Sequence, residues 1–254
     1  MDNTKQSIVS FCSGYGGIER GLELAGILHR VVTHVEIEAF SVAVLVKEME
    51  KGYLDASPIW TNLKTFPAKQ FCGKVHGITA GYPCQPFSVA GSQKGKDDPR
   101  HLWPYILDHI KAIKPAWVFL ENVRGHVKNG LREVLADLGE ADYRSSWEIF
   151  SAKEVGAPHR RERVFVLAHA NSIRPQRIWQ NSNQKGRERQ EERPSRLRDG
   201  TGRGSHWEIE PAVGRVANGI TNRVDRLRIL GNGVVPQQAA FAFTTLKNKL
   251  QNEF

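Results

Sequence analysis

The fold expected for this chain is decided by the stretch Ile8-Val9-Ser10-Phe11-Cys12-Ser13-Gly14-Tyr15-Gly16-Gly17. Its first four residues favour a buried strand, and a turn rich in glycine follows. The next residues form an amphipathic pattern with Ile18, Leu22 and Ala25 on one face of a helix. Glycines let a backbone approach a nucleotide closely and open the helix amino terminus towards it. The stretch predicts the first unit of an α/β fold, although a plain tight turn is an alternative interpretation of the glycines.

A second predicted strand, Val31 to Val35, ends in Glu36, which lies twenty residues beyond Gly16 (36 − 16). An acidic residue at this place can accept hydrogen bonds from both ribose hydroxyls of a nucleotide. The glycine spacing is not the dinucleotide fingerprint, because no third glycine follows at the expected position. The pattern therefore favours an adenosyl ligand over a nicotinamide dinucleotide.

A reactive cysteine is the next candidate feature. The apolar run Gly77-Ile78-Thr79-Ala80 predicts a buried strand, and Gly81-Tyr82-Pro83-Cys84-Gln85-Pro86-Phe87-Ser88 follows it. Open α/β sheets bind their ligands at the carboxyl ends of strands, and the two prolines stiffen the loop. The pattern suggests that Cys84 is a nucleophile, while a buried structural thiol is the alternative.

A carboxylate ends another predicted strand. The apolar residues 116–120 follow a predicted helix, Trp103 to Ile113, and they run directly into Glu121-Asn122-Val123. A carboxylate at the carboxyl end of a buried strand costs free energy unless it reaches solvent or a partner. We therefore expect Glu121 to face the same crevice as Cys84. A helix-capping role for Asn122 is the alternative.

Composition limits the class of protein. The chain has 254 residues, of which 40% are hydrophobic, and this predicts one main soluble domain. We expect a cytoplasmic protein, because no apolar run reaches membrane-spanning length and the amino terminus lacks the core of a signal peptide. Three cysteines without metal-ligand spacing predict reduced thiols, no disulfide framework and no metal site. A net charge of +9 favours a polyanionic partner.

Five motifs in order carry a family resemblance. They are Phe11-Cys12-Ser13-Gly14-Tyr15-Gly16-Gly17, Gly81 to Ser88, Glu121-Asn122-Val123, Arg161-Glu162-Arg163 and Gly231-Asn232-Gly233-Val234-Val235-Pro236. This series resembles that of the bacterial and phage DNA (cytosine-5)-methyltransferases. The resemblance implies a Rossmann-like, S-adenosylmethionine-dependent methyltransferase fold with a small irregular basic recognition segment. It also implies S-adenosyl-L-methionine as cofactor, double-stranded DNA as partner and 5-methylcytosine as product.

The resemblance assigns chemical roles by position. Cys84 matches the nucleophile that adds to carbon 6 of cytosine, and Glu121 matches the acid that contacts ring nitrogen 3 and the amino group. Asn122 resembles the residue that positions this carboxylate. Arg163 would bond the cytosine carbonyl oxygen, and Arg161 would support the site. The target base must flip out of the duplex.

Binding residues follow in the same way. The implied cofactor residues are Phe11, Gly14, Gly16, Gly17, Ile18, Glu36, Ile37, Asn62, Leu63, Gly81, Pro83, Leu102, Asn232, Gly233 and Val234. The candidate DNA contacts are Gln85, Ser88, Lys94, Arg100, Arg223 and Arg226. Asn62 departs from the family pattern, which commonly has an aspartate there, but its amide oxygen can still accept a hydrogen bond.

The expected organisation has three parts. Residues 1–170 form the catalytic and cofactor-binding domain, residues 171–227 a short basic recognition segment, and residues 228–254 a motif and helix that pack back on the catalytic domain, against its first strand. Residues 174–204 contain nine basic residues and only Ile178, Trp179 and Leu197 as large apolar ones. This composition predicts a flexible arm, which either orders on DNA or has no role.

Two other functions stay open at this stage. An RNA cytosine methyltransferase of the same fold would carry the same motifs, and a catalytically inactive DNA-binding relative would explain the short recognition segment. Intact Cys84, Glu121 and Arg163 count against the inactive relative. We expect a monomer from a bacterial cell, encoded with a restriction-modification system or by a phage or prophage.

Overall fold

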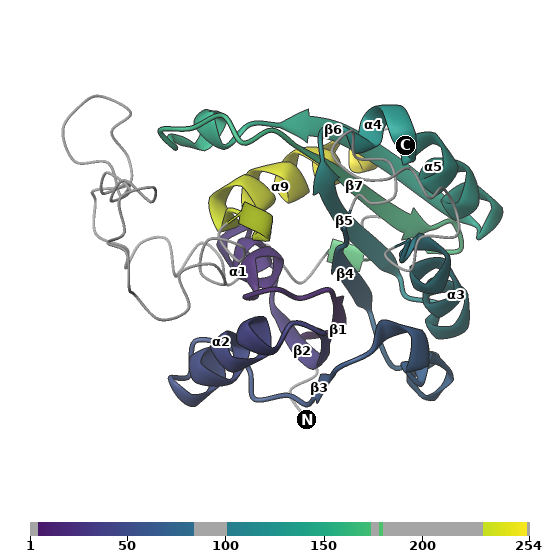
Figure 1. The fold of residues 1–254 in the computed structure, drawn as a ribbon. Coiled ribbons are helices and arrows are strands. Elements are labelled where there is room, and N and C mark those ends of the chain that lie inside the picture. The colour runs from purple at the N-terminus through teal and green to yellow at the C-terminus, as the bar shows by residue number, and fades with distance from the viewer. Residues whose placement is uncertain (1–4, 84–100, 174–177, 180–230, 253–254) are drawn as a thin grey trace.

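A mixed sheet forms the centre of the structure, a computed structural model that describes residues 5–83, 101–173, 178–179 and 231–252 (Figure 1). The strands of the described part are β1 (Gln6–Phe11), β2 (His29–Val35), β3 (Ile59–Trp60), β4 (Gly77–Gly81), β5 (Trp117–Val123), β6 (Tyr143–Phe150) and β7 (Arg163–Ala170). Their order in the sheet is β3-β2-β1-β4-β5-β7-β6. The first five strands are parallel, whereas β7 runs antiparallel to β5 and β6.

The helices form a layer on each face of the sheet. Among the described residues, the α-helices are α1 (Gly17–Leu24), α2 (Ala39–Glu50), α3 (Trp103–Ile113), α4 (His126–Asn129), α5 (Leu131–Glu140) and α9 (Pro236–Asn252), and the short 3-10 helices are η1 (Leu63–Thr65), η2 (Ala68–Phe71) and η4 (Ala152–Val155). In Figure 1, α1 and α9 lie on one side of the sheet, and α3 and α5 lie on the other. Within the described residues, no helix has both the length and the apolar character needed to cross a membrane.

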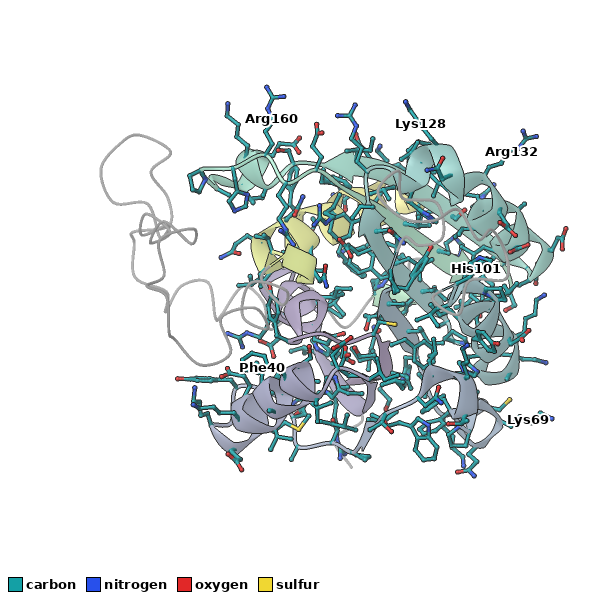
Figure 2. The ribbon with its side chains drawn as sticks, viewed as in Figure 1. Phe40, Lys69, His101, Lys128, Arg132 and Arg160 are labelled. Carbon is teal, nitrogen blue, oxygen red and sulfur yellow. The ribbon has the colours of Figure 1, made fainter. Side chains whose placement is uncertain are left out.

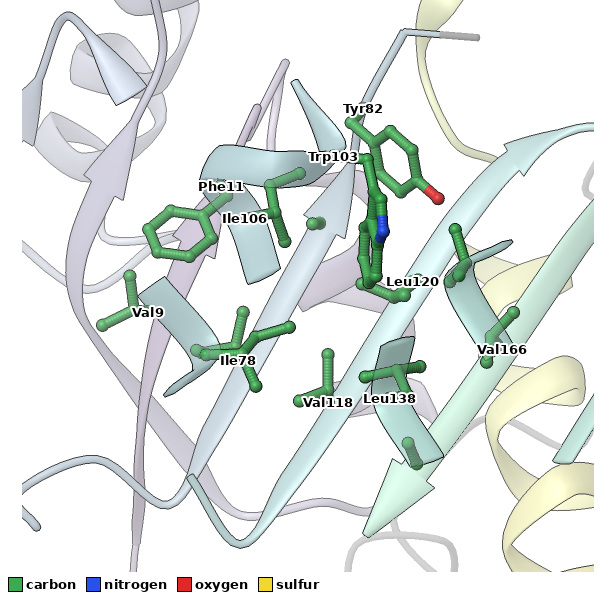
Figure 3. Close-up of a cluster of buried hydrophobic side chains, with 14 of the residues drawn as sticks. Val9, Phe11, Ile78, Tyr82, Trp103, Ile106, Val118, Leu120, Leu138 and Val166 are labelled. Atoms are coloured by element: carbon green, nitrogen blue, oxygen red, sulfur yellow. The ribbon is translucent and has the colours of Figure 1, made fainter. Parts of the chain in front are cut away.

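Two hydrophobic clusters hold these layers together. One contains Ile78, Val118 and Leu120 from the sheet together with Ile106 and Leu138 from α3 and α5 (Figure 3). The other joins strand residues to apolar residues of α1 and α9 on the opposite face. Central parallel strands are buried on both faces, and this is why β4 and β5 read as continuous apolar runs in the sequence.

The sequence predicted several of these elements closely. The predicted helix Trp103 to Ile113 is α3, and the predicted strands of the amino-terminal half correspond to β1, β2 and β4. Strand β5 continues through Glu121 and Asn122 to Val123, so these two polar residues lie inside the strand rather than beyond it.

Two expectations were wrong. Ile178 and Trp179 do not belong to a core-free arm, because both are buried and Trp179 packs edge-on against Phe243 of α9. The carbonyl oxygen of Ile178 also accepts a hydrogen bond from Nε2 of Gln6 at 2.8 Å. The final helix does not pack mainly against the first strand, since its principal neighbours are α1, β6 and β7. The remainder of residues 174–230 lies outside the described part.

Candidate active site

The predicted motifs meet where the strand order of the sheet changes direction. Strands β1 and β4 are neighbours, and the chain continues outward from β1 to β2 and from β4 to β5. In such a doubly wound sheet a crevice opens outside the carboxyl ends of the strands at this switch point. The turn after Phe11 and the residues after Gly81 both begin there. The topology therefore places the glycine motif and the cysteine motif side by side in the described backbone up to Pro83.

The glycine turn faces Glu36 across the crevice. The backbone N–H of Gly14 donates to Oε2 of Glu36 at 2.7 Å, and the N–H of Glu38 donates to Oε1 at 2.8 Å. Burial raises the pKa of Glu36, while these backbone donors lower it. A carboxylate has about four lone-pair sites, so two backbone donors leave capacity for hydroxyl groups.

The surroundings of Glu36 fit an adenosyl ligand. Ile37 leaves 72% of its surface exposed directly after the acid, and an apolar side chain of this kind can pack against a purine ring. Gly14 has a φ of 57°, and a Cβ atom at this position would meet nothing within 4 Å, so the turn leaves open space beside the carboxylate. The residues present thus match the ribose and adenine ends of S-adenosylmethionine.

A buried acid near the carboxyl end of β5 meets an arginine at the amino end of the antiparallel strand β7. Oε1 of Glu121 pairs with Nε of Arg163 at 2.9 Å, and both side chains are largely buried. Gly81 is the register partner of Glu121, and a Cβ atom at Gly81 would lie 3.4 Å from Oε2 of the acid. Burial raises the pKa of Glu121 to about 7, even though Arg163 and Arg161 lower it. This carboxyl group can therefore carry a proton near neutral pH.

Asn122 fixes the segment that leads to Cys84. Its Nδ2 donates to the carbonyl oxygen of Tyr82 at 3.0 Å, and its Oδ1 accepts from the backbone N–H of Val123 at 2.8 Å. Because Asn122 lies inside β5, it does not cap a helix. The side chain instead ties the end of β4 to the strand that carries Glu121.

Arg161 joins the site to the last motif. Its Nη2 donates to the carbonyl oxygen of Gly231 at 2.8 Å and also to that of Gly233. The backbone of Arg161 has a φ of 36°, a left-handed conformation that is rare for residues other than glycine. The side-chain bonds to Gly231 and Gly233 therefore accompany a strained backbone conformation, which the sequence alone does not predict.

Tyr15 and Gln238 complete the arrangement, and the sequence analysis missed both. The hydroxyl of Tyr15 donates to the carbonyl oxygen of Val234 at 2.5 Å. Nε2 of Gln238, which is fully buried in α9, donates to the carbonyl oxygens of Phe150 and Arg161 at 2.8 and 2.9 Å. An aromatic residue between glycines was an available signal for Tyr15, whereas nothing local distinguishes Gln238.

The remaining predicted residues lie in different environments. Phe11 is fully buried, and its ring packs edge-on against Phe66. Asn62 uses its Oδ1 to accept from the backbone N–H of Lys64 at 3.0 Å, so it caps η1. Leu63 is buried, Leu102 is half-buried and Pro83 is exposed. The predicted residues outside the described part are Cys84, Gln85, Ser88, Lys94, Arg100, Arg223 and Arg226.

The sheet order, the glycine turn opposite Glu36 and the acid at the end of β5 define the class of protein, which has the S-adenosylmethionine-dependent methyltransferase fold. Solved structures share this fold. The structure of the Dnmt2 methyltransferase from S. pombe is similar with a TM-score of 0.55 and 25% sequence identity, over 66% of this chain and 51% of that one. Residues 6–210 match the family described as C-5 cytosine-specific DNA methylase, and the chain belongs to this family.

Curated relatives are similar over most of this chain but over less of their own length. Type II methyltransferase M.NaeI of Lentzea aerocolonigenes is 31% identical over 176 residues, which are 68% of this chain and 42% of the relative. Type II methyltransferase M.CviJI of Paramecium bursaria Chlorella virus IL3A is 30% identical over 237 residues, covering 92% of this chain and 57% of that protein. The chain thus spans about half the length of the curated relatives it matches.

Proposed function

We propose that this chain transfers a methyl group from S-adenosylmethionine to carbon 5 of a flipped-out cytosine in double-stranded DNA. The observation that carries this proposal is the position of Glu121, a buried acid that pairs with Arg163 and lies beside Gly81. Gly81 is the last residue of β4, and Cys84 follows it by three residues (84 − 81). Membership of the C-5 cytosine-specific DNA methylase family supports the substrate and the carbon that is modified.

The chain's own groups divide the chemistry. The thiolate of Cys84 adds to carbon 6 of cytosine, and carbon 5 thereby becomes nucleophilic. Glu121 donates its proton towards ring nitrogen 3 and stabilises the charge that develops on the base, a task that a pKa of about 7 suits. Arg163 bonds the carbonyl oxygen of cytosine, while Asn122 and Arg161 hold the site. Once carbon 5 has accepted the methyl group, loss of its proton to water, return of the nitrogen 3 proton to Glu121 and departure of the Cys84 sulfur restore the aromatic ring.

The other cysteines suit this role less well. Burial, and to a lesser extent the charge of Glu36, raises the pKa of the Cys12 thiol to about 12, so the thiol stays protonated. Cys72 is exposed after η2, where the next residue, Gly73, bonds the carbonyl oxygen of Ile113 at the far end of α3. These properties favour Cys84, whose motif follows the strand end beside Glu121.

The chain's residues would hold the cofactor at the switch point. Glu36 would bind the ribose, Ile37, Asn62 and Leu63 would meet the adenine, and the glycine turn would adjoin the methionine part. When bound, S-adenosylmethionine supplies the methyl group. Gly233 and Val234 would complete the pocket, because Arg161 and Tyr15 hold this segment against the glycine turn.

DNA is the proposed partner, and the cytoplasm of a bacterial cell is the proposed location. The net charge of +9 favours a polyanion, and Figure 2 shows Lys128, Arg132 and Arg160 along one edge of the molecule. We propose that residues 1–170 bind the cofactor and the base, that residues 171–227 contribute to recognition, and that the protein acts as a monomer.

A covalent-trapping assay tests the function. Fluorine at carbon 5 blocks the final elimination, so DNA that contains 5-fluorocytosine stays bound to the cysteine when the cofactor is present. We expect a shifted band on a denaturing gel for the wild type and for Cys72→Ala, and none for Cys84→Ala. A band that survives in Cys84→Ala would refute the assignment of the nucleophile. Trapping on a matched RNA but not on DNA would instead favour the RNA methyltransferase.

A further inference from the structure

Tyr82 is anchored at three points, two residues before Cys84. The residue directly follows β4, and only 5% of its surface is exposed. Its carbonyl oxygen accepts from Nδ2 of Asn122, its hydroxyl hydrogen-bonds to Nε2 of His126 at 3.0 Å, and its ring lies 5.8 Å from that of Trp103. Figure 3 shows Tyr82 and Trp103 side by side above the apolar cluster. Backbone, hydroxyl and ring are thus fixed by three different elements of the fold.

The position and the neutral state of His126 suit it to accept a hydrogen bond from the hydroxyl of Tyr82. It begins α4, it is 7% exposed, and its ring meets that of Tyr82 edge-on at 5.6 Å. Burial lowers the pKa of His126 to about 4, so the imidazole is neutral at physiological pH and can offer one nitrogen as an acceptor. A Cβ atom at Gly130 would lie 2.6 Å from Cε1 of the ring, so only glycine leaves room for the imidazole in this place.

Trp103 is itself locked. Its Nε1 donates to Oδ2 of Asp137 at 2.7 Å, and this bond links α3 to α5. The indole is 3% exposed, so it presents a fixed surface to the tyrosine ring. The fixed indole of Trp103 therefore restricts the position of the Tyr82 ring.

Proline connects this anchor to the nucleophile. Pro83 separates Tyr82 from Cys84, and its ring fixes φ near −65°, which removes one of the soft torsions between them. We propose that Tyr82 and His126 are positioning residues for the methyl-transfer reaction, because together they fix the point from which the chain continues to Cys84. This inference rests on the proposed function, in which Cys84 is the nucleophile. Neither side chain would touch the base or the cofactor.

Single-turnover trapping on 5-fluorocytosine DNA tests the pair. Tyr82→Phe keeps the ring and removes the hydroxyl, so we expect the rate of adduct formation to fall about 10-fold, since small misplacements of a reacting group cost one to two orders of magnitude. Calorimetric affinity for S-adenosylmethionine should stay within about 2-fold of the wild type, because the hydroxyl is bonded to His126 of α4, which is not among the proposed cofactor residues. His126→Leu should match Tyr82→Phe, and the double variant should be no slower than either, as expected for two members of one interaction.

Two further variants separate positioning from general stability. His126→Gln places an amide where Nε2 lay and should recover most of the rate. Tyr143→Phe is the matched control: Tyr143 is buried in the same cluster, and its hydroxyl donates to the carbonyl oxygen of Pro115 at 2.7 Å, before the amino end of β5. The Tyr143→Phe substitution also removes one hydrogen bond from a tyrosine hydroxyl. It should lower the melting temperature without slowing adduct formation.

The outcomes distinguish this inference from the function on which it rests. Wild-type trapping with unchanged rates in Tyr82→Phe would overturn the positioning role alone. A Tyr143→Phe variant as slow as Tyr82→Phe would also overturn it, because loss of stability would then account for both. Absence of any Cys84-dependent adduct in the wild type would remove the proposed function and this inference together.

Discussion

Replacing Glu121 by glutamine should make the protein more stable above neutral pH while abolishing most of its activity. In the folded protein the pKa of this acid is raised to about 7 from its ordinary value of 4.5, with burial as the largest cause. Between these two values the unfolded chain releases a proton that the folded protein keeps, so the contribution of Glu121 to stability is full below pH 4.5 and is lost by pH 7. A difference of 2.5 pKa units (7 − 4.5) corresponds to about 3 kcal/mol. Glutamine has the shape of the protonated acid and does not titrate.

Urea unfolding of both proteins from pH 4 to pH 8 measures this difference. The advantage of Glu121→Gln should grow by about 3 kcal/mol between pH 4.5 and pH 7 and then level off. Glu148→Gln is the control, because Glu148 forms an exposed pair with Lys249 and its loss should change stability by less than about 1 kcal/mol at every pH. Methyl transfer by Glu121→Gln should fall about 100-fold or more, as expected when a general acid is lost. A stability difference that stays flat across this range would show that Arg163 keeps Glu121 ionised, and it would refute the argument from burial.

Two further predictions concern the cofactor side of the site. Glu36→Ala should weaken S-adenosylmethionine binding in calorimetry by about 10- to 100-fold, because hydrogen bonds from the ribose to a charged group are lost; an unchanged affinity would remove Glu36 from the pocket. Gly17→Ala should lower the free energy of unfolding by about 1–3 kcal/mol, because its Cβ would collide with the carbonyl oxygen of Val234. Gly139→Ala in α5, where a Cβ meets nothing within 4 Å, should be neutral or stabilise the protein by up to about 1 kcal/mol; equal effects of the two changes would contradict the assigned contact.

The parallel half of the sheet was predictable because its burial leaves a simple pattern. Strands β1, β4 and β5 are covered on both faces, so each appears as an apolar run that ends where a polar motif begins. The antiparallel edge was not predictable in the same way. In strand β6 only Tyr143 and Phe150 are buried, and the other residues are exposed or half-buried, so its sequence gives neither strict alternation nor an apolar run. The strand takes its place through pairing with β7, which is a long-range property of the fold.

In the candidate site, too, some features were predictable from local sequence pattern and others were not. The places of Glu36 and Glu121 at the ends of strands followed from local pattern, and the structure brings both to the switch point. The contacts that join the motifs did not follow, because they connect residues far apart in sequence through backbone carbonyl oxygens. The hydroxyl of Tyr15 reaches Val234, and the guanidinium of Arg161 reaches Gly231 and Gly233. A carbonyl acceptor is present at every residue, so the sequence carries no signal for it.

The interval between the Arg163 motif and the Gly231 motif is held at both of its ends. At its start, Ile178 and Trp179 enter the core against α9, and at its end Arg161 binds the carbonyl oxygens of Gly231 and Gly233. Because the entropic cost of closing a loop grows only slowly with its length, a change in the number of residues between two fixed ends has little effect on the rest of the fold. In the proposed function, the recognition segment can therefore vary in length while Glu121, Arg163 and the glycine turn keep their geometry.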